Sequence, residues 1–101
     1  MQVGILAPMD VHSDDGAEGL ARVVGRALRL AREKRGLSQE HLAMDAGYTR
    51  EYIGLLERGR KNLTLLAVFR LAQVLAIAPS ELVRDVEEEL RAQAKLPPTG
   101  C

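Results

Sequence analysis

Hydrophobic residues recur along most of this chain at the three- and four-residue spacing of an α-helix. From Leu20 the apolar positions alternate with arginine and lysine until Gly36 interrupts them. This spacing gathers the apolar side chains on one face and predicts a helix that begins at Leu20. Its core-facing row is Leu20, Val24, Leu28 and Ala31. A second row, Val23, Ala27 and Leu30, lies on the opposite side and is expected to be open to the N-terminal segment or a partner chain.

Two short helices follow, joined by a turn with a single glycine. Ser38 and Thr49 are suitable N-caps, because their hydroxyl oxygens accept hydrogen bonds from free backbone N–H groups at a helix start. Gly47 and Gly59 are suitable ends, because glycine adopts positive φ without a steric penalty. The pattern therefore predicts two helices of about two turns each. The inward residues are Leu42 and Ala43 in the first helix, and Tyr52, Ile53 and Leu56 in the second.

Two further helices are expected in the C-terminal part of the chain. The first has a broad apolar face and should be the most buried helix. The second begins at Pro79, since proline favours the first position of a helix, and it extends toward Ala94. The apolar face of the first consists of Leu65, Val68, Phe69, Leu71, Ala72 and Leu75.

These elements predict an all-α fold of five helices in a single domain, as expected for 101 residues. We assign the domain to residues 20–94. Residues 1–19 are predicted to be a flexible acidic arm, because Gly, Pro, Asp and Ser occur there without a sustained period. Residues 95–101 are predicted to be a disordered tail, because two consecutive prolines end any helix.

The charge of the chain is unevenly distributed, although the net charge is zero. Residues 20–78 contain eleven basic and five acidic residues, a net charge of +6, whereas residues 1–19 carry −4 and residues 79–101 carry −2. A local basic surface is what attracts phosphate, even when the whole protein is neutral. The middle of the chain is therefore compatible with nucleic-acid binding.

Composition also limits the chemistry that we expect. The single cysteine, Cys101, can form neither an intrachain disulfide nor a thiolate zinc site, which fits a reducing cytoplasm. No run of 18 apolar residues and no signal-peptide pattern occurs, so we expect a cytoplasmic protein without a membrane partner. His12 and His41 have no neighbours that would form a catalytic or metal site. We expect no enzyme activity, no cofactor and no metal.

Five residues in the two short helices and the turn that joins them have the spacing of a tight helical corner. Counted from Gln39, they occupy the fourth, fifth, ninth, fifteenth and eighteenth positions. A small residue lets the second helix approach the first, a glycine turns the backbone, and two large apolar residues fill the gap beneath the pair. These positions are Leu42, Ala43, Gly47, Ile53 and Leu56.

The segment "LAREKRGLSQEHLAMDAGYTREYIGLLERGRKN", with "LAVFRLAQVLAIAPSEL" after it, resembles the Cro/repressor type of helix-turn-helix domain, the XRE family. The resemblance covers about residues 20–83, and "RGLSQE" with "YI…LERG" is specific for this family. It implies a five-helix domain that places its third helix in the major groove of double-stranded DNA. The implied activity is binding.

The resemblance also implies roles for individual residues. Arg32 and Glu57 match an ion pair that ties the first helix to the third. Phosphate contacts are implied for Ser38, Gln39, Arg60, Lys61 and Asn62. Base contacts are implied for Thr49, Arg50, Glu51, Gly54 and Leu55.

Other interpretations of these residues are available, and the match is incomplete. Arg50 and Glu51 could form an ordinary exposed helix start, in which the acid favours the helix dipole, and Arg60 and Lys61 could form a solvated loop. Leu55 replaces a more usual polar residue. Ala76 stands where glycine often ends the fourth helix, and Ala78 offers no side-chain cap to the fifth.

An apolar row in the last helix, Leu82, Val86 and Leu90, is longer than a monomer requires and predicts a two-fold contact between copies. We therefore expect a sequence-specific transcriptional regulator, a repressor, that binds an inverted-repeat operator as a homodimer. Two alternatives remain. One is the antitoxin of a toxin–antitoxin pair, in which an acidic segment folds on a toxin or another regulator as protein partner. The other is the controller protein of a restriction-modification system.

Overall fold

The computed structural model describes residues 14–93, which form five α-helices and no strand. The predicted all-α class is confirmed. Most of the predicted acidic arm, residues 1–13, and all of the predicted tail lie outside the described residues. The helices are α1 (Asp14–Lys34), α2 (Gln39–Ala46), α3 (Arg50–Glu57), α4 (Leu65–Leu75) and α5 (Pro79–Gln93).

The first helix begins six residues earlier than its apolar pattern predicts. α1 starts at Asp14, whereas the periodic apolar positions start at Leu20. The added turns have the sequence Asp14 to Gly19, in which acidic residues and glycine outnumber apolar ones. Apolar periodicity does not detect such a segment. Residues 14–19, which we had assigned to the arm, are therefore helical.

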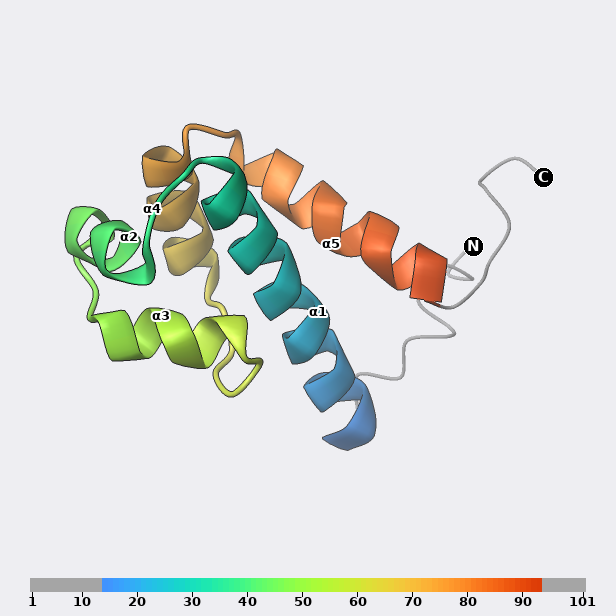
Figure 1. Ribbon diagram of the computed structural model, residues 1–101. Coiled ribbons are helices and arrows are strands. Elements are labelled where there is room, and N and C mark those ends of the chain that lie inside the picture. Colours follow the sequence, from blue (N-terminus) through green and yellow to red (C-terminus); the bar gives the residue numbers. More distant parts are fainter. Residues whose placement is uncertain (1–13, 94–101) are drawn as a thin grey trace.

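The long helix α1 runs through the middle of the molecule (Figure 1). α3 crosses near it on one side, α5 lies along its other side, and α2 and α4 close the fold at the end where α1 finishes. α2 and α3 contact each other, as expected for consecutive helices joined by a tight turn. This arrangement leaves one side of α3 against the core and the other on the surface.

The main core lies where α1, α2, α3 and α4 meet. Its largest fully buried side chains come from all four of these helices, so the four helices share one packed interior. Half-buried tyrosines extend this core: the rings of Tyr48 and Tyr52 lie 4.8 Å apart, and Arg70 lies 5.7 Å from the Tyr48 ring centre. The principal buried residues are Leu28, Leu42, Ile53, Leu56, Leu71 and Leu75.

A smaller core cluster joins α1, α4 and α5 through Ala27, Val68 and Leu82. It corrects two predictions. Val23 and Ala27 are buried, so the second apolar row of α1 is filled within the chain, and only Leu30 is exposed. Leu82 is 1% exposed, so it cannot contact a second copy as predicted. The prediction for Leu82 failed because α5 packs along α1, so Leu82 contacts α1 and α4 of its own chain.

The predicted N-caps Ser38 and Thr49 are present, and Thr64 and Glu81 cap two further helix starts. Ser38, Thr49 and Thr64 each accept a backbone hydrogen bond at a helix start. Ala76 ends α4 in the left-handed region with φ of 60°, a conformation that glycine adopts more easily. At the start of α5 the Glu81 carboxylate accepts a hydrogen bond of 2.9 Å from the Ala78 N–H, which supplies the cap that the Ala78 side chain cannot.

As predicted, α4 has more buried residues than any other described helix, but two residues of its apolar face lie on the surface. Leu65 and Phe69 are 70% and 55% exposed, and Val83 of α5 is 52% exposed. All three line a shallow groove between α4 and α5. Residues 65 and 69 lie one turn apart on the side of α4 that faces away from α2, which explains their exposure.

Candidate nucleic-acid interface

The α2–α3 corner has the geometry that its residue spacing implied. Gly47 ends α2 with φ of 82°, and the Tyr48 N–H donates a hydrogen bond of 2.8 Å to the Ala43 carbonyl oxygen. Ala43 is 2% exposed, while Ile53 and Leu56 are 0% and 2% exposed. The corner therefore has a closed apolar interior, and the start of α3 is directed away from it.

A glycine that we had not singled out allows α3 to lie against α1. A Cβ atom on Gly25 would lie 2.4 Å from the Leu56 carbonyl oxygen and 2.6 Å from that of Glu57. No larger residue fits unless the two helices separate. A glycine inside a helical pattern lowers helix stability and often has such a packing reason, so the sequence did contain a signal.

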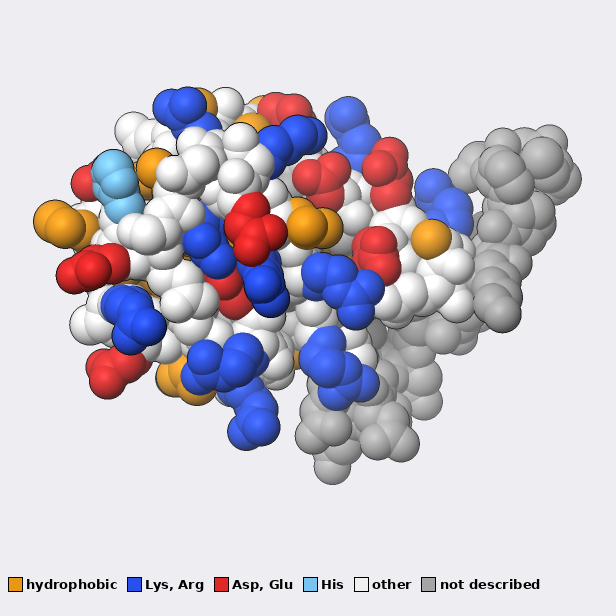
Figure 2. Space-filling model, in the orientation of Figure 1, with side chains coloured by type: hydrophobic (Ala, Val, Ile, Leu, Met, Phe, Trp, Pro, Cys, Tyr) orange, Lys and Arg blue, Asp and Glu red, His pale blue; other side chains and the backbone are white. Residues whose placement is uncertain are grey.

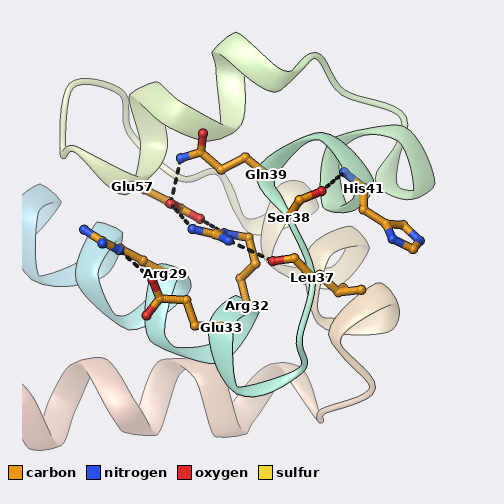
Figure 3. A network of polar contacts seen from close by, with 8 residues as sticks. All are labelled: Arg29, Arg32, Glu33, Leu37, Ser38, Gln39, His41 and Glu57. Atoms are coloured by element: carbon orange, nitrogen blue, oxygen red, sulfur yellow. Dashed lines mark hydrogen bonds and ion pairs between the residues drawn. The ribbon is translucent and has the colours of Figure 1, made fainter.

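An ion pair fixes the end of α3 to α1 (Figure 3). Two nitrogens of Arg32 donate to the two carboxylate oxygens of Glu57, at 2.6 Å from Nε and 3.0 Å from Nη2. Arg32 also donates to the Leu37 carbonyl oxygen at 2.8 Å, and the Gln39 amide donates to Glu57 at 2.9 Å. The Glu57 side chain is 3% exposed. This network joins the end of α1, the start of α2 and the end of α3.

The network has two electrostatic consequences. Its hydrogen bond to Glu57 raises the pKa of Arg32 above the ordinary arginine value, so the Arg32 guanidinium keeps its proton. Because Glu57 holds the Gln39 amide, the first residue of α2 has a fixed orientation toward α3. Burial separately raises the pKa of Tyr52, with Tyr48 as a smaller cause.

The predicted base-contacting residues divide into two groups. Thr49, Arg50 and Glu51 are exposed at the start of α3, and Leu55 is half-buried one turn later. Gly54, in contrast, is buried, and the Arg58 guanidinium lies over it. The assignment of Gly54 as a base-contacting residue is therefore wrong for this structure: it has no side chain, and a neighbour covers its backbone.

The predicted phosphate-contacting residues lie on both sides of α3. Ser38 and Gln39 stand at the start of α2, although the Ser38 hydroxyl already accepts a hydrogen bond of 3.0 Å from the His41 N–H. Arg60, Lys61 and Asn62 are exposed in the connection after α3. Figure 2 shows basic side chains in a broad band over α3, this connection and the middle of α1.

Several of these cations have no acidic partner among residues 14–93. Arg50, Arg58, Arg60 and Lys61 take part in no ion pair there, whereas Arg26, Arg29 and Arg32 are paired with glutamates. Unpaired cations on one surface attract an anionic partner more strongly than neutralised ones. Sequence reasoning missed Arg58 in this group because the family motif does not assign it a contact.

The described part of the chain contains neither a metal-binding cluster nor a single helix that could span a membrane. No group of three or more His, Cys, Asp or Glu residues is placed to hold a metal ion there. None of the five helices alone is long and apolar enough to cross a membrane, and α4 with α5 would pass such a test only as a pair bent by 106°.

Comparison with known families identifies this corner. A family model described as helix-turn-helix matches residues 28–82, which is more than half of the chain and includes α2, α3 and α4. The matched region contains every residue for which a base or phosphate contact was expected.

Two curated proteins are similar over most of their own length. The uncharacterized HTH-type transcriptional regulator y4dJ of Sinorhizobium fredii is 35% identical over 68% of this chain and 90% of its own. The control protein C.MunI of a Mycoplasma species is 36% identical over 60% of this chain and 82% of its own.

Two crystal structures share the fold. The clp gene regulator ClgR of Corynebacterium glutamicum has a TM-score of 0.72 and 25% identity, and the match covers 75% of this chain and 81% of that one. The restriction-modification controller protein C.AhdI of Aeromonas hydrophila has a TM-score of 0.59 and 44% identity, over 63% of this chain and 96% of that one.

Proposed function

Because this chain belongs to the helix-turn-helix family, we propose that it is a sequence-specific DNA-binding transcriptional regulator that represses its target genes from an inverted-repeat operator. In this proposal α3 enters the major groove of double-stranded DNA. The observation that carries it is the exposed first turn of α3, where Thr49, Arg50 and Glu51 project from a helix whose other side is fixed to the core. The proposal places the protein in the cytoplasm and requires no cofactor or enzyme activity.

The side chains at the start of α3 suit base recognition. The Arg50 guanidinium can donate two hydrogen bonds to guanine O6 and N7, and the Glu51 carboxylate can accept one from cytosine N4. Leu55, one turn later, can contact a thymine methyl group. Each interaction needs a side chain without a competing partner, and neither Arg50 nor Glu51 forms an ion pair within residues 14–93.

Phosphate contacts on both sides would fix the position of α3 in the groove. Free backbone N–H groups at the start of α2 favour an anion, and Gln39 is already oriented there by Glu57. Arg60 and Lys61 extend from the connection after α3 and suit the opposite backbone. Such contacts position a protein on DNA without selecting a sequence.

A homodimer would match an operator with half-site centres about one helical turn, 34–36 Å, apart. With Leu82 buried, the proposed interface moves to the exposed groove between α4 and α5, where Leu65, Phe69 and Val83 lie. Arg84 and Glu87 line the same groove, and a two-fold contact can bring the cation of one copy to the acid of the other. Val86 and Leu90 are half-buried along α5, and their part in a dimer stays a prediction.

The experiment is a selection of operators from random DNA, followed by binding measurements at several salt concentrations. We expect a palindromic consensus and a binding constant that falls linearly with the logarithm of salt, because phosphate contacts release counterions. Binding that is independent of salt, or equal for the selected and random sequences, would reject the proposal.

A second candidate is favoured by the comparisons: control of a restriction-modification system. C.AhdI is a restriction-modification controller protein by name and is 44% identical over its match, and C.MunI is named a control protein. Genes for a methyltransferase and an endonuclease beside the gene for this chain would support it. The antitoxin alternative predicts a small basic protein that copurifies in stoichiometric amount from the native host.

A further inference from the structure

The second turn of α3 has almost no polar side chain to offer to DNA. Leu56 is buried, and both carboxylate oxygens of Glu57 are occupied by Arg32 and Gln39. Leu55 is apolar and half-buried, and Gly54 has no side chain. If only residues of α3 itself were available, this turn could make apolar contacts but could not recognise a hydrogen-bonding base edge.

Arg58, the residue after α3, supplies a polar side chain to this turn. Its Nη1 atom lies 3.2 Å from the point where a Cβ atom of residue 54 would be, and its Cζ atom lies 3.9 Å from that point. Helical side chains lean toward the N-terminus of their helix, so residue 58 covers the surface of residue 54, one turn earlier. The absence of a side chain at Gly54 is what gives the guanidinium this room.

The surroundings leave the Arg58 guanidinium free to bind an external acceptor. It forms no ion pair with any residue of 19–93, the range whose side chains the structure describes, and residue 58 is exposed. The Gln39 amide lies on the same side of α3, with its Nε2 atom 3.9 Å from the same Cβ position. That Nε2 atom donates to Glu57, so it is a hydrogen-bond donor like the guanidinium and does not serve as its acceptor.

Resting on the function proposed above, we propose that Arg58 reads a base edge, guanine O6 and N7, in the place of the side chain that Gly54 lacks. Arg50 and Gly54 lie one turn apart on α3, and the Arg58 guanidinium folds back from the residue after the helix to the position above Gly54. The two arginines therefore approach the groove from the same face, one at each end. Arg58 becomes a specificity-determining residue, and the operator position that it reads differs from the position read by Arg50.

The direction of the side chain favours a base over a phosphate. Arg60 and Lys61 extend from the connection beyond α3, where the DNA backbone is expected. Arg58 is folded back along α3 toward its middle, the part of a recognition helix that lies in the groove. A lysine could satisfy a phosphate equally well, but only arginine has the planar fork for a bidentate contact with guanine.

The test compares variants on the operator selected by the wild-type protein, with every base pair changed in turn. Arg58→Ala should lose discrimination at one position of each half-site by about 5- to 150-fold and keep it elsewhere. Arg58→Lys should recover total affinity but only part of that discrimination. Arg91→Ala, which removes a cation from the far end of α5, is the matched control and should leave every position unchanged.

A second variant tests the role of Gly54 without removing Arg58. Gly54→Gln puts a side chain where the guanidinium lies, so it should displace Arg58 and change the preferred base at the same position that Arg58→Ala relaxes. Thermal unfolding of both variants shows whether they remain folded. A change at a different position from the Arg58→Ala position would overturn the proposal.

Two results with Arg58→Ala would overturn the inference while the proposed function remains. One is an equal loss of affinity for all sequences with a smaller salt dependence, which identifies a phosphate contact. The other is unchanged affinity and specificity. If the wild-type protein selects no sequence, the proposed function fails, and this inference fails with it.

Discussion

The two sides of α3 differ in almost every physical respect. The inner side carries Ile53 and Leu56 in the core, Glu57 in a buried ion pair and a backbone that touches Gly25 of α1. The outer side carries Arg50 and Glu51, which are exposed and form no ion pair within residues 14–93. One side is fixed by packing and by charge, and the other is free to bind.

This difference separates stability from recognition. A base contact is selective only if the side chain that makes it is held in position, and here the inner side of α3 supplies that rigidity. Substitutions on the inner side should therefore change the free energy of unfolding, and substitutions on the outer side should change DNA binding alone.

The largest effect is expected from Glu57→Ala. It leaves the Arg32 charge buried without its partner, and the loss of one member of a buried pair costs about 3–5 kcal/mol of unfolding free energy. Urea unfolding measures this cost. The control is Glu33→Ala, which breaks the exposed Arg29–Glu33 pair of α1 and should cost less than about 0.5 kcal/mol. Similar losses for the two variants would show that the Glu57 network does not fix α3.

Gly25→Ala tests the close approach of α1 and α3. The added methyl group would lie 2.4 Å from the Leu56 carbonyl oxygen, so the helices must move apart, at a cost of about 1–3 kcal/mol. The matched control is Gly19→Ala in the same helix, where the nearest atom would be 4.0 Å away. That control should stabilise the protein by up to about 1 kcal/mol through helix propensity. Stabilisation by both substitutions would contradict the tight contact.

On the outer side, Arg50→Ala should leave unfolding unchanged and weaken binding to the selected operator by about 1–3 kcal/mol, with relaxed preference at one position. Lys61→Ala serves as the comparison, because a phosphate contact weakens binding to all sequences about equally and lowers the salt slope by about 1. Fluorescence anisotropy with operator and random DNA distinguishes the two. If Arg50→Ala weakens binding to operator and to random DNA equally, Arg50 does not contact a base.

The smallest effect is expected far from α3, at the end of α4. Ala76 has φ of 60°, a conformation that disfavours a residue with a Cβ atom. Ala76→Gly should raise the unfolding free energy by about 0.5–1 kcal/mol without changing DNA affinity. The same urea titration measures it, and a decrease in stability would show that the alanine is not strained.

The parts of the fold that depend on local periodicity were predictable. The caps at Ser38 and Thr49 and the glycine at position 47 placed α2 and α3 within a residue of their ends, because hydroxyl caps and positive φ are local requirements. The Arg32–Glu57 ion pair, expected from the family resemblance, is present. Local pattern and family motif together therefore placed the recognition helix.

Features that depend on the packing of distant helices were not predictable. The sequence shows an apolar row in α5 but not which helix covers it, so Leu82 was assigned to a dimer although Ala27 and Val68 cover it. Leu65 and Phe69 had the right period for a core face and are nevertheless exposed. Arg58 was missed because spacing alone does not show that its side chain folds back over Gly54.

In the proposed function, the outer side of α3 is the surface that touches DNA. NMR mapping of backbone amides during titration with the selected operator shows which surface is in contact. We predict that the largest shifts occur at Arg50, Glu51, Leu55 and Arg58, with further shifts at the start of α2 and in the connection after α3. Saturable binding with shifts confined to α5, and with α3 unaffected, would contradict the claim.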